Sequence, residues 1–388
     1  MRKEVVLKSG KEKAILNRHH WIFSGAIDSL PEFQNGELLE VADNKGHLLG
    51  QAYFNKHASI IGRMLCFSDT PVEQHIFHLI QSAWDFRQTI FPDKDTNAFR
   101  VINGEGDFFP GLVVDKYADV LVIQVGTLGV EKLKPVILDA LHKIIRPKTI
   151  FEKSALPSRK EEGLQPVEQL LFGEPPGVTT IIENGIQFAV DIVKGQKTGF
   201  FLDQREMRKL IGSLAKGKKL LNCFGYTGGF SAYAAKYGAM QVDTVDISAE
   251  AIALAERNVK ANNRIAKLHF FQEDVFAFLR KQPLNYDIII LDPPAFAKRK
   301  KDIIQACRGY KDINRVAMEK MPPGSLLLSC SCSHYVDAAL FQKVLFQAAV
   351  EAKRKVRIVA HHHLAADHPI NICHPEGEYL KSLLLYVE

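Results

Sequence analysis

The chain has 388 residues, of which 46% are hydrophobic and 24% are charged. These values are ordinary for globular proteins, so they disfavour intrinsic disorder, collagen-like repeats and coiled coils. At roughly 150 residues per domain, the length predicts two or three domains with their own cores. The first residues are too charged for a secretory segment, and no later run approaches the roughly 18 apolar residues of a membrane span. We therefore expect a cytoplasmic protein that does not enter a membrane.

Charge and cysteine usage narrow the class further. Fifty Lys and Arg residues against 44 acids give a net charge of +6, with the surplus concentrated in residues 1–20 and 294–320. Such a distribution is compatible with a polyanionic partner but does not identify one. The six cysteines are too few and too scattered for a disulfide framework, so we expect reduced thiols.

The first two domains are predicted from periodicity and turn residues. Residues 1–72 contain short apolar stretches broken by Gly and Asn, with strands expected at 37–42 and 60–66, which is typical of a small β-barrel. Apolar residues then recur at helical spacing over 71–90, so a connecting helix opens a β-rich middle domain, 73–190. Its predicted elements are strands at 99–102, 112–115, 120–125 and 149–152, a helix at 131–145, and a loop or hairpin excursion at 154–176.

The last domain, 191–388, has the alternating pattern of an α/β sheet. Helical stretches separate seven strand candidates, at 219–224, 241–247, 268–274, 286–291, 325–331, 356–361 and 382–387. This alternation predicts an open, mostly parallel, Rossmann-like sheet with helices on both faces. The final strand follows a loop without a crossover helix, so we expect it to be inserted antiparallel.

Polar and glycine residues follow the first four strands of this sheet, where ligands bind in doubly wound folds. The first strand leads into a turn with Gly225 and Gly228, whose spacing is not G-x-G-x-x-G. The second and third strands end in Asp246 and Asp274, and the fourth in Asp292-Pro-Pro. A Gly-rich turn alone also suits an ordinary strand-to-helix connection, but the ordered set favours a ligand site.

That ordered set resembles the class I S-adenosylmethionine-dependent methyltransferases, whose seven-stranded sheet also ends in an antiparallel strand. The segment 197–205, Lys-Thr-Gly-Phe-Phe-Leu-Asp-Gln-Arg, is similar to one that precedes the cofactor domain in RNA methyltransferases, although an ordinary helix N-terminus would also explain Asp203. The resemblance implies S-adenosyl-L-methionine as cofactor. The cofactor-binding residues that it implies are Phe200, Asp203, Arg205, Asn222, Phe224, Gly225, Tyr226, Thr227, Gly228, Asp246, Ser248, Asp274, Asp292 and Pro293.

A cysteine at the end of the fifth strand supplies a candidate nucleophile. Cys332 lies in Ser-Cys-Ser-Cys-Ser-His, residues 329–334. Thiolates are strong nucleophiles near neutral pH, and addition at carbon 6 of cytosine makes its carbon 5 able to accept a methyl group. Asp292, at the neighbouring strand end, is predicted to face the N3/N4 edge of such a base.

With these residues in view, the whole chain resembles the bacterial 23S rRNA cytosine-C5 methyltransferases, which have a PUA domain, a β-rich middle domain and a Rossmann-like methyltransferase domain. The similar segments are 7–25, the Tyr-Lys-Asp-Ile-Asn of 310–314 and Ser-Cys-Ser at 331–333. The resemblance implies RNA as partner, 23S rRNA or a large-subunit precursor, and Cys332 as nucleophile. Cys330 is a second candidate, although Cys332 lies nearer the carboxyl edge. Because C-x-C with scattered histidines is poor spacing for structural zinc, no metal is expected.

The residues after Asp292 are candidates for substrate binding. A basic run follows the two prolines, and its position beside the predicted pocket favours phosphate contacts over a solvated helix face. Phe296 is expected to stack on an extruded base. The predicted substrate-binding residues are Pro294, Phe296, Lys298, Arg299 and Lys311.

Two other functions remain open at this stage. A guanine N-methyltransferase would share the Lys-Thr-Gly and Asp-Pro-Pro segments without needing a thiol, and a non-catalytic RNA-binding or ribosome-assembly protein would share the first domain. An NAD dehydrogenase is disfavoured by the glycine spacing. The sequence does not fix the modified nucleotide, the group that removes the carbon 5 proton, or the oligomeric state, for which a homodimer is one option.

Overall fold

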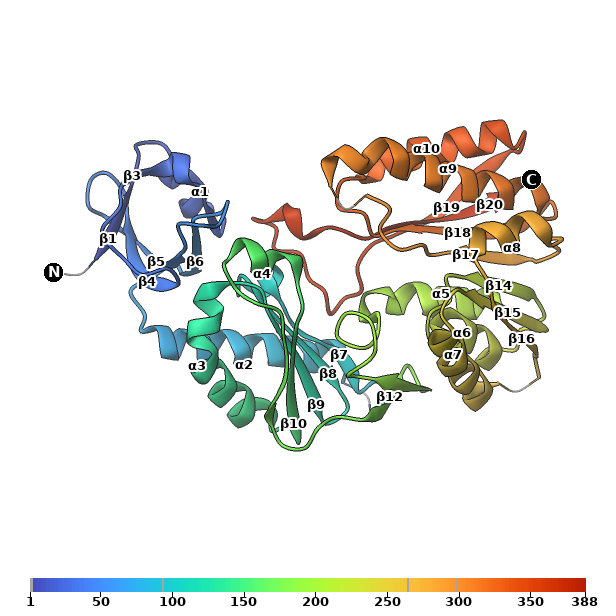
Figure 1. Ribbon diagram of the computed structural model, residues 1–388, viewed down its shortest axis with the longest axis horizontal. Helices are drawn as coiled ribbons and strands as arrows, with labels where there is room; N and C mark the ends of the chain where they lie inside the picture. Colours follow the sequence, from blue (N-terminus) through green and yellow to red (C-terminus); the bar gives the residue numbers. More distant parts are fainter. Residues whose placement is uncertain (1–2, 93, 264, 298) are drawn as a thin grey trace. The chain divides into compact units, whose positions relative to one another are not determined.

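The chain folds into two compact units, shown in a computed structural model that describes residues 3–92, 94–263, 265–297 and 299–388 (Figure 1). The first unit holds the chain up to Thr179, together with Asp191–Leu202 and Ala366–Gly377. The second holds Thr180–Val190, Asp203–Ala365 and Glu378–Glu388. In the part of the chain described, none of the helices is long and apolar enough to cross a lipid bilayer.

The predicted N-terminal β-domain is a six-stranded sheet with strand order β2-β6-β5-β4-β1-β3. Its elements are β1 (Glu4–Leu7), α1 (Glu12–Leu16), β2 (Trp21–Ile22), β3 (Ile27–Ser29), β4 (Glu37–Ala42), β5 (Leu48–Phe54) and β6 (Gly62–Cys66). Alternate side chains such as Val5, Leu39 and Met64 form its core. Gly50 has a φ of 139°, and a Cβ there would lie 2.1 Å from the Cys66 carbonyl oxygen, so only glycine permits this approach of β5 to β6.

The middle region is a five-stranded sheet, β11-β10-β9-β8-β7, on which α2 and α3 pack. Its elements are α2 (Val72–Ile90), β7 (Ala98–Asn103), β8 (Leu112–Tyr117), β9 (Val120–Val125), α3 (Leu128–Ile145), β10 (Thr149–Ser154), α4 (Pro157–Glu161) and β11 (Val167–Phe172). The excursion expected at 154–176 is a return hairpin, because β11 pairs antiparallel with β10. Tyr53 of β5 joins the core of this region, where its hydroxyl donates to the Pro110 carbonyl at 2.6 Å.

Two segments assigned from sequence to the last domain belong instead to the first unit. The Thr198 hydroxyl donates to Asp115 at 2.6 Å, which ties Asp191–Leu202 to β8. The Asp367 carbonyl accepts from Arg87 of α2 at 2.7 Å, and its carboxylate accepts from the Arg100 backbone N–H at 2.8 Å. These polar contacts join residues far apart in sequence. The boundaries of the compact units therefore differ from the single domain boundary expected between residues 190 and 191.

The second unit contains the predicted seven-stranded sheet, in the order β16-β15-β14-β17-β18-β20-β19. The strands are β14 (Lys219–Cys223), β15 (Gln241–Asp246), β16 (Lys267–Gln272), β17 (Ile288–Leu291), β18 (Ser325–Ser331), β19 (Val356–His362) and β20 (Lys381–Val387). As expected, β20 is inserted antiparallel, between β18 and β19. This confirms the Rossmann-like arrangement predicted from the sequence.

Helices connect the strands of this sheet. They are α5 (Arg205–Leu214), α6 (Gly229–Lys236), α7 (Ala249–Asn262), α8 (Val275–Lys281), α9 (Ile303–Lys320) and α10 (Ala338–Glu351). The last three pack with the strands into one apolar core, while α5, α6 and α7 pack in sequence as a second group (Figure 1). The sheet is thereby covered on both faces, and its chemistry is confined to the strand ends.

A two-stranded hairpin, β12 (Val178–Glu183) with β13 (Ile186–Asp191), contributes Thr180–Val190 to the second unit. Glu183 is fully buried and accepts from Arg208 of α5 at 2.8 and 2.7 Å. Burial opposes the charge on Arg208, but Glu183 outweighs it and raises the pKa of the guanidinium. No local sequence pattern signals this pair, which is why residues up to 190 are assigned from sequence to the middle domain.

Candidate active site

The turn after β14 is held in a strained conformation beside Asp246. Phe224 and Tyr226 have φ values of 57° and 44°, in the left-handed region that side chains rarely adopt. The backbone N–H of Tyr226 donates to Asp246 at 2.9 Å, and the N–H of Ser248 donates to the other carboxylate oxygen at 2.9 Å. The Asp246 carboxylate is therefore fixed in orientation at the end of β15, as a ribose-binding acid requires.

The two glycines of the turn are required for packing. A Cβ on Gly225 would lie 2.5 Å from the Thr244 methyl carbon, and one on Gly228 would lie 3.1 Å from the Ala255 Cα. Gly228 also has a φ of 77°. Both positions bring the start of α6 close to β15 and α7, so the glycines set the shape of the turn.

Two buried polar atoms in this region suit a bound ligand. Asn222 and Thr227 are 1% and 3% exposed. Within the described chain, the Asn222 side-chain oxygen and the Thr227 hydroxyl have no hydrogen-bond partner, although the Asn222 amide donates to Ser231 at 2.9 Å. Buried polar atoms nearly always have a hydrogen-bond partner. The two unpaired atoms therefore indicate a missing polar partner, and a polar cofactor would provide one. The residues present therefore fit S-adenosylmethionine.

Three further residues predicted for cofactor binding have local structural roles. Ser248 and Asp274 cap α7 and α8 by accepting from the N–H groups of Ala251 at 3.2 Å and Ala277 at 2.9 Å. Phe224 contacts the Phe276 ring edge-on, with ring centroids 6.3 Å apart. Capping fixes the side chains of Ser248 and Asp274, and the cap uses only one of the two Asp274 carboxylate oxygens.

The segment at 200–205 is divided between the two compact units. Phe200 belongs to the first unit, where its backbone N–H donates to the Tyr117 hydroxyl at 3.2 Å. Asp203 belongs to the second and accepts from the Tyr379 hydroxyl at 2.5 Å. Arg205 is buried, with its Nε 3.4 Å from Glu183, so it shares the buried charge cluster of the hairpin. Their contacts with a cofactor remain predictions.

The structure separates the two candidate cysteines. Cys330 is fully buried in β18, and burial, reinforced by the Asp292 charge, raises the pKa of its thiol well above its usual value. Cys332 follows the last residue of β18, is partly exposed, and has its Sγ 3.9 Å from the Pro293 carbonyl oxygen. Since thiolates are the reactive form, Cys332 is the better placed nucleophile.

Asp292 lies at the end of β17, which pairs in parallel with β18 beside it. Its carboxylate is partly buried and accepts from the Gln204 side-chain amide at 2.7 Å. Pro293 is buried and Pro294 is exposed. The predicted pair of Asp292 and Cys332 therefore comes from adjacent strand ends, with Gln204 orienting the carboxylate.

A lysine that the sequence analysis missed lies beside Cys332. Lys381 is 6% exposed and opposes Ser331 across the β18–β20 pair. Its Nζ donates to the carbonyls of Ser333 at 2.7 Å and Tyr379 at 2.8 Å. Burial lowers the pKa of Lys381, while the charge of Cys332 acts in the opposite direction. The last strand was expected to begin at residue 382, which left Lys381 in the preceding loop.

The predicted substrate residues have contacts of their own. The Phe296 ring packs partly buried against Tyr310, with centroids 4.6 Å apart, so it forms a wall of the site. Arg299 is exposed and lies 3.3 Å from Asp302, and Lys311 donates to Glu351 of α10 at 2.6 Å. Lys298 lies outside the described residues. Contacts of this group with RNA stay a prediction.

Sequence comparisons identify two regions of the chain. Residues 160–368 match the model of an S-adenosylmethionine-dependent methyltransferase family, and residues 5–67 match that of a PUA-like domain. The chain is 41% identical to the ribosomal RNA large subunit methyltransferase I of Shewanella denitrificans over 392 residues, which covers 99% of both chains.

Two solved structures have a similar fold over nearly the full length of the chain. A protein of Streptococcus mutans described as a SAM-dependent methyltransferase is 26% identical with a TM-score of 0.83, and 99% of each chain is covered. A second solved methyltransferase, complexed with SAH, is 26% identical with a TM-score of 0.84 and the same coverage. The strand ends that carry Asp246, Asp292 and Cys332 thus lie in the region that matches the methyltransferase family model, whereas Lys381 lies beyond it.

Proposed function

The chain belongs to the S-adenosylmethionine-dependent ribosomal RNA large subunit methyltransferases, and we propose that it methylates carbon 5 of cytosine in 23S rRNA through a covalent adduct with Cys332. The observation that carries this proposal is the partial exposure of Cys332 at the strand edge beside Asp292, in contrast to the fully buried Cys330.

The proposed chemistry explains why a thiol is needed. Carbon 5 of cytosine is too electron-poor to attack a methyl donor directly. The Cys332 thiolate adds to carbon 6, and the electron pair displaced from the ring double bond makes carbon 5 nucleophilic. After methylation, removal of the carbon 5 proton returns an electron pair to the ring, and the C6–S bond breaks to release the thiolate.

Lys381 supports the thiolate in this proposal. It is a buried lysine whose Nζ bonds two backbone carbonyls near Cys332. A buried ammonium group favours a neighbouring negative charge, because the low dielectric strengthens their attraction. Lys381 is a positioning residue here, since it acts on the base through Cys332.

Asp292 binds the base in this proposal. Its carboxylate accepts from Gln204 at 2.7 Å, and a carboxylate at this strand end is a suitable acceptor for the cytosine amino group. Burial, and after it the Asp292 charge, raises the pKa of Cys330, which helps to keep that thiol protonated. The role proposed for Asp292 is therefore recognition of the base.

Cofactor binding is assigned to the turn after β14 and the end of β15. Asn222 and Thr227 offer buried polar atoms, and Asp246 offers a fixed carboxylate for a ribose diol. When bound, S-adenosylmethionine supplies a methyl group on a positively charged sulfur. The resemblance also implies Phe200, Asp203 and Arg205 as cofactor-binding residues, and of these Asp203 and Arg205 belong to the same unit as the turn.

RNA is the proposed partner of both the PUA-like module and the strand edge. A role on ribosomal RNA also favours a cytoplasmic location. The basic residues Arg299 and Lys311 are proposed to contact phosphates, with Phe296 as a wall against an extruded base.

The test is to incubate the protein with methyl-labelled S-adenosylmethionine and unmodified 23S rRNA, digest the RNA and identify the labelled nucleoside. We expect label in 5-methylcytidine. Label in a methylguanosine would overturn the cytosine proposal and reduce both cysteines to structural roles. If naked RNA is not labelled, the same assay on ribosomal particles decides, and no label there would favour a non-catalytic RNA-binding protein.

A further inference from the structure

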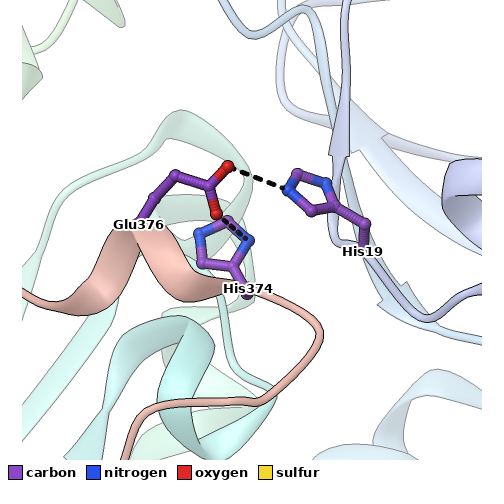
Figure 2. Close-up of side chains that lie close together, drawn as sticks. All are labelled: His19, His374 and Glu376. Atoms are coloured by element: carbon purple, nitrogen blue, oxygen red, sulfur yellow. Dashed lines mark hydrogen bonds and ion pairs between the residues drawn. The ribbon is translucent and has the colours of Figure 1, made fainter.

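A cluster of two histidines and a carboxylate lies in the first compact unit and shares no residue with the site proposed above (Figure 2). His19 precedes β2 of the PUA-like module, whereas His374 and Glu376 lie in the segment Ala366–Gly377. His19 and Glu376 are hydrogen-bonded to one another although they lie 357 positions apart in the chain. The three side chains point toward a common centre in Figure 2.

The spacing of the donor atoms suits a metal ion. His19 Nε2 lies 3.4 Å from one Glu376 oxygen, and His374 Nδ1 lies 3.7 Å from the other. One atom from each residue lies within 4.8 Å of the other two. Tetrahedral zinc with bonds of about 2.0–2.1 Å separates its ligand atoms by about 3.3 Å, so only small side-chain adjustments are required.

His374 gives a second, independent indication. The residue is 2% exposed, and its Nδ1 has no hydrogen-bond partner among the described residues. Its ring is held between Trp21, at a centroid distance of 4.4 Å, and His19, at 4.7 Å. A buried nitrogen that lies 3.7 Å from a carboxylate oxygen lacks a hydrogen bond to it, and a bound cation would provide a partner.

The donor set also suits a cation. Two imidazoles and a carboxylate are ligands typical of zinc sites with an open position. His374 is buried, whereas the Glu376 side chain is half-exposed.

We propose that His19, His374 and Glu376 bind one divalent transition-metal ion of the zinc class, which fastens the segment Ala366–Gly377 to the PUA-like module. The half-exposed side of Glu376 leaves a coordination position for water. This inference concerns the first compact unit and does not depend on the methylation chemistry.

Binding requires one change at His19. The Trp21 backbone N–H donates to His19 Nδ1 at 3.2 Å, so the neutral ring carries its proton on Nε2, facing Glu376. Ligation through Nε2 places the proton on Nδ1 and gives up that long hydrogen bond. The contribution of one long hydrogen bond is small beside the binding free energy of a structural zinc site.

The test uses the full chain, freed of metal by a chelator and kept reduced, and titrated with zinc by calorimetry. We expect one ion per chain in the wild type. His374→Ala and Glu376→Gln should each weaken zinc binding at least about 10-fold, because removing a ligand costs more than removing a ligand's hydrogen-bond partner. Glu376→Gln keeps the shape of a half-exposed side chain, so it tests the site even if His374→Ala fails to fold.

The matched control is His47→Ala, because His47 also pairs with a carboxylate, that of Asp43, on the same module but without a second histidine. Zinc binding should be unchanged in this variant. Cobalt in place of zinc identifies the ligands, and its spectrum should show nitrogen and oxygen coordination. A thiolate-to-cobalt absorption band, absence of stoichiometric zinc binding, or full affinity in Glu376→Gln would each overturn the proposal.

Discussion

The strand-end site of the second unit has two halves that are built differently. The half after β14 and β15 depends on the backbone: two non-glycine residues with positive φ, two glycines in close packing and two N–H groups on Asp246. The half after β17 and β18 depends on side chains from elsewhere in the chain, since Gln204 orients Asp292 and Lys381 lies beside Cys332. The first half is suited to binding one cofactor in a fixed position. The second half is suited to chemistry on a substrate base.

The largest effect is expected in the reactive half. Cys332→Ala removes the proposed nucleophile, so methylation should fall by at least about 10³-fold. Binding of S-adenosylmethionine, measured by calorimetry, should be unchanged because the other half is intact. The matched control is Cys330→Ala, which should keep most of its activity, since that thiol is buried and its pKa is raised. Loss of activity in Cys330→Ala alone would transfer the role to Cys330.

The next largest effect concerns Lys381. Lys381→Met removes the buried positive charge beside Cys332, so the thiolate fraction at neutral pH should fall and kcat should drop about 10- to 100-fold. The rising limb of the pH–rate profile should move to higher pH, because the thiolate then forms less readily. Lys381→Arg, which keeps the charge, should recover part of the rate. An unshifted profile in Lys381→Met would show that the lysine only supports packing.

A smaller effect is expected in the cofactor half. Asp246→Asn removes the charge that two N–H groups hold in place, so affinity for S-adenosylmethionine should fall about 10-fold. At saturating cofactor, kcat should stay near the wild-type value. Asp274→Asn is the comparison, and its loss should be smaller because Asp274 is exposed and caps α8. An equal loss in both variants would contradict the assignment of Asp246 as the main ribose-binding acid.

The smallest effect tests the basic face. Lys311→Met breaks a half-exposed pair with Glu351, and such pairs contribute about 0–1 kcal/mol, so the free energy of unfolding should change little. If Lys311 contacts a phosphate, RNA affinity should fall a few-fold, and the salt dependence of binding should lose about one unit of slope. Lys143→Met, which breaks a surface pair with Asp139, is the control. Identical RNA binding in both variants would assign Lys311 to the helix surface alone.

The two halves also differ in how well the sequence predicts them. The glycine turn, Asp246 and the approximate positions of the seven strands along the chain follow from local patterns, because each signal is carried by a few consecutive residues. The antiparallel insertion of β20 was likewise predicted, from the missing crossover helix. What the local pattern did not predict was the strain at Phe224 and Tyr226, which results from packing around the turn.

The reactive half was predicted less completely. Cys332 and Asp292 were identified as strand-end residues, but Gln204 and Lys381 were missed, because each reaches the site from a distant segment. The same limit applies to the compact units, whose boundaries depend on pairs such as Glu183 with Arg208 and Arg87 with Asp367. The site of His19, His374 and Glu376 has no local motif either, since its ligands are joined only by folding.

The most direct test of the central claim is to trap the proposed adduct. RNA that carries 5-fluorocytidine allows thiolate addition and methylation, but the fluorine at carbon 5 cannot leave as a proton does, so the enzyme stays bound. We expect a stable complex that requires S-adenosylmethionine, with the cytidine on the peptide at Cys332 by mass spectrometry and no complex in Cys332→Ala. Attachment at Cys330, or methylation of cytidine without any trapped complex, would contradict the account.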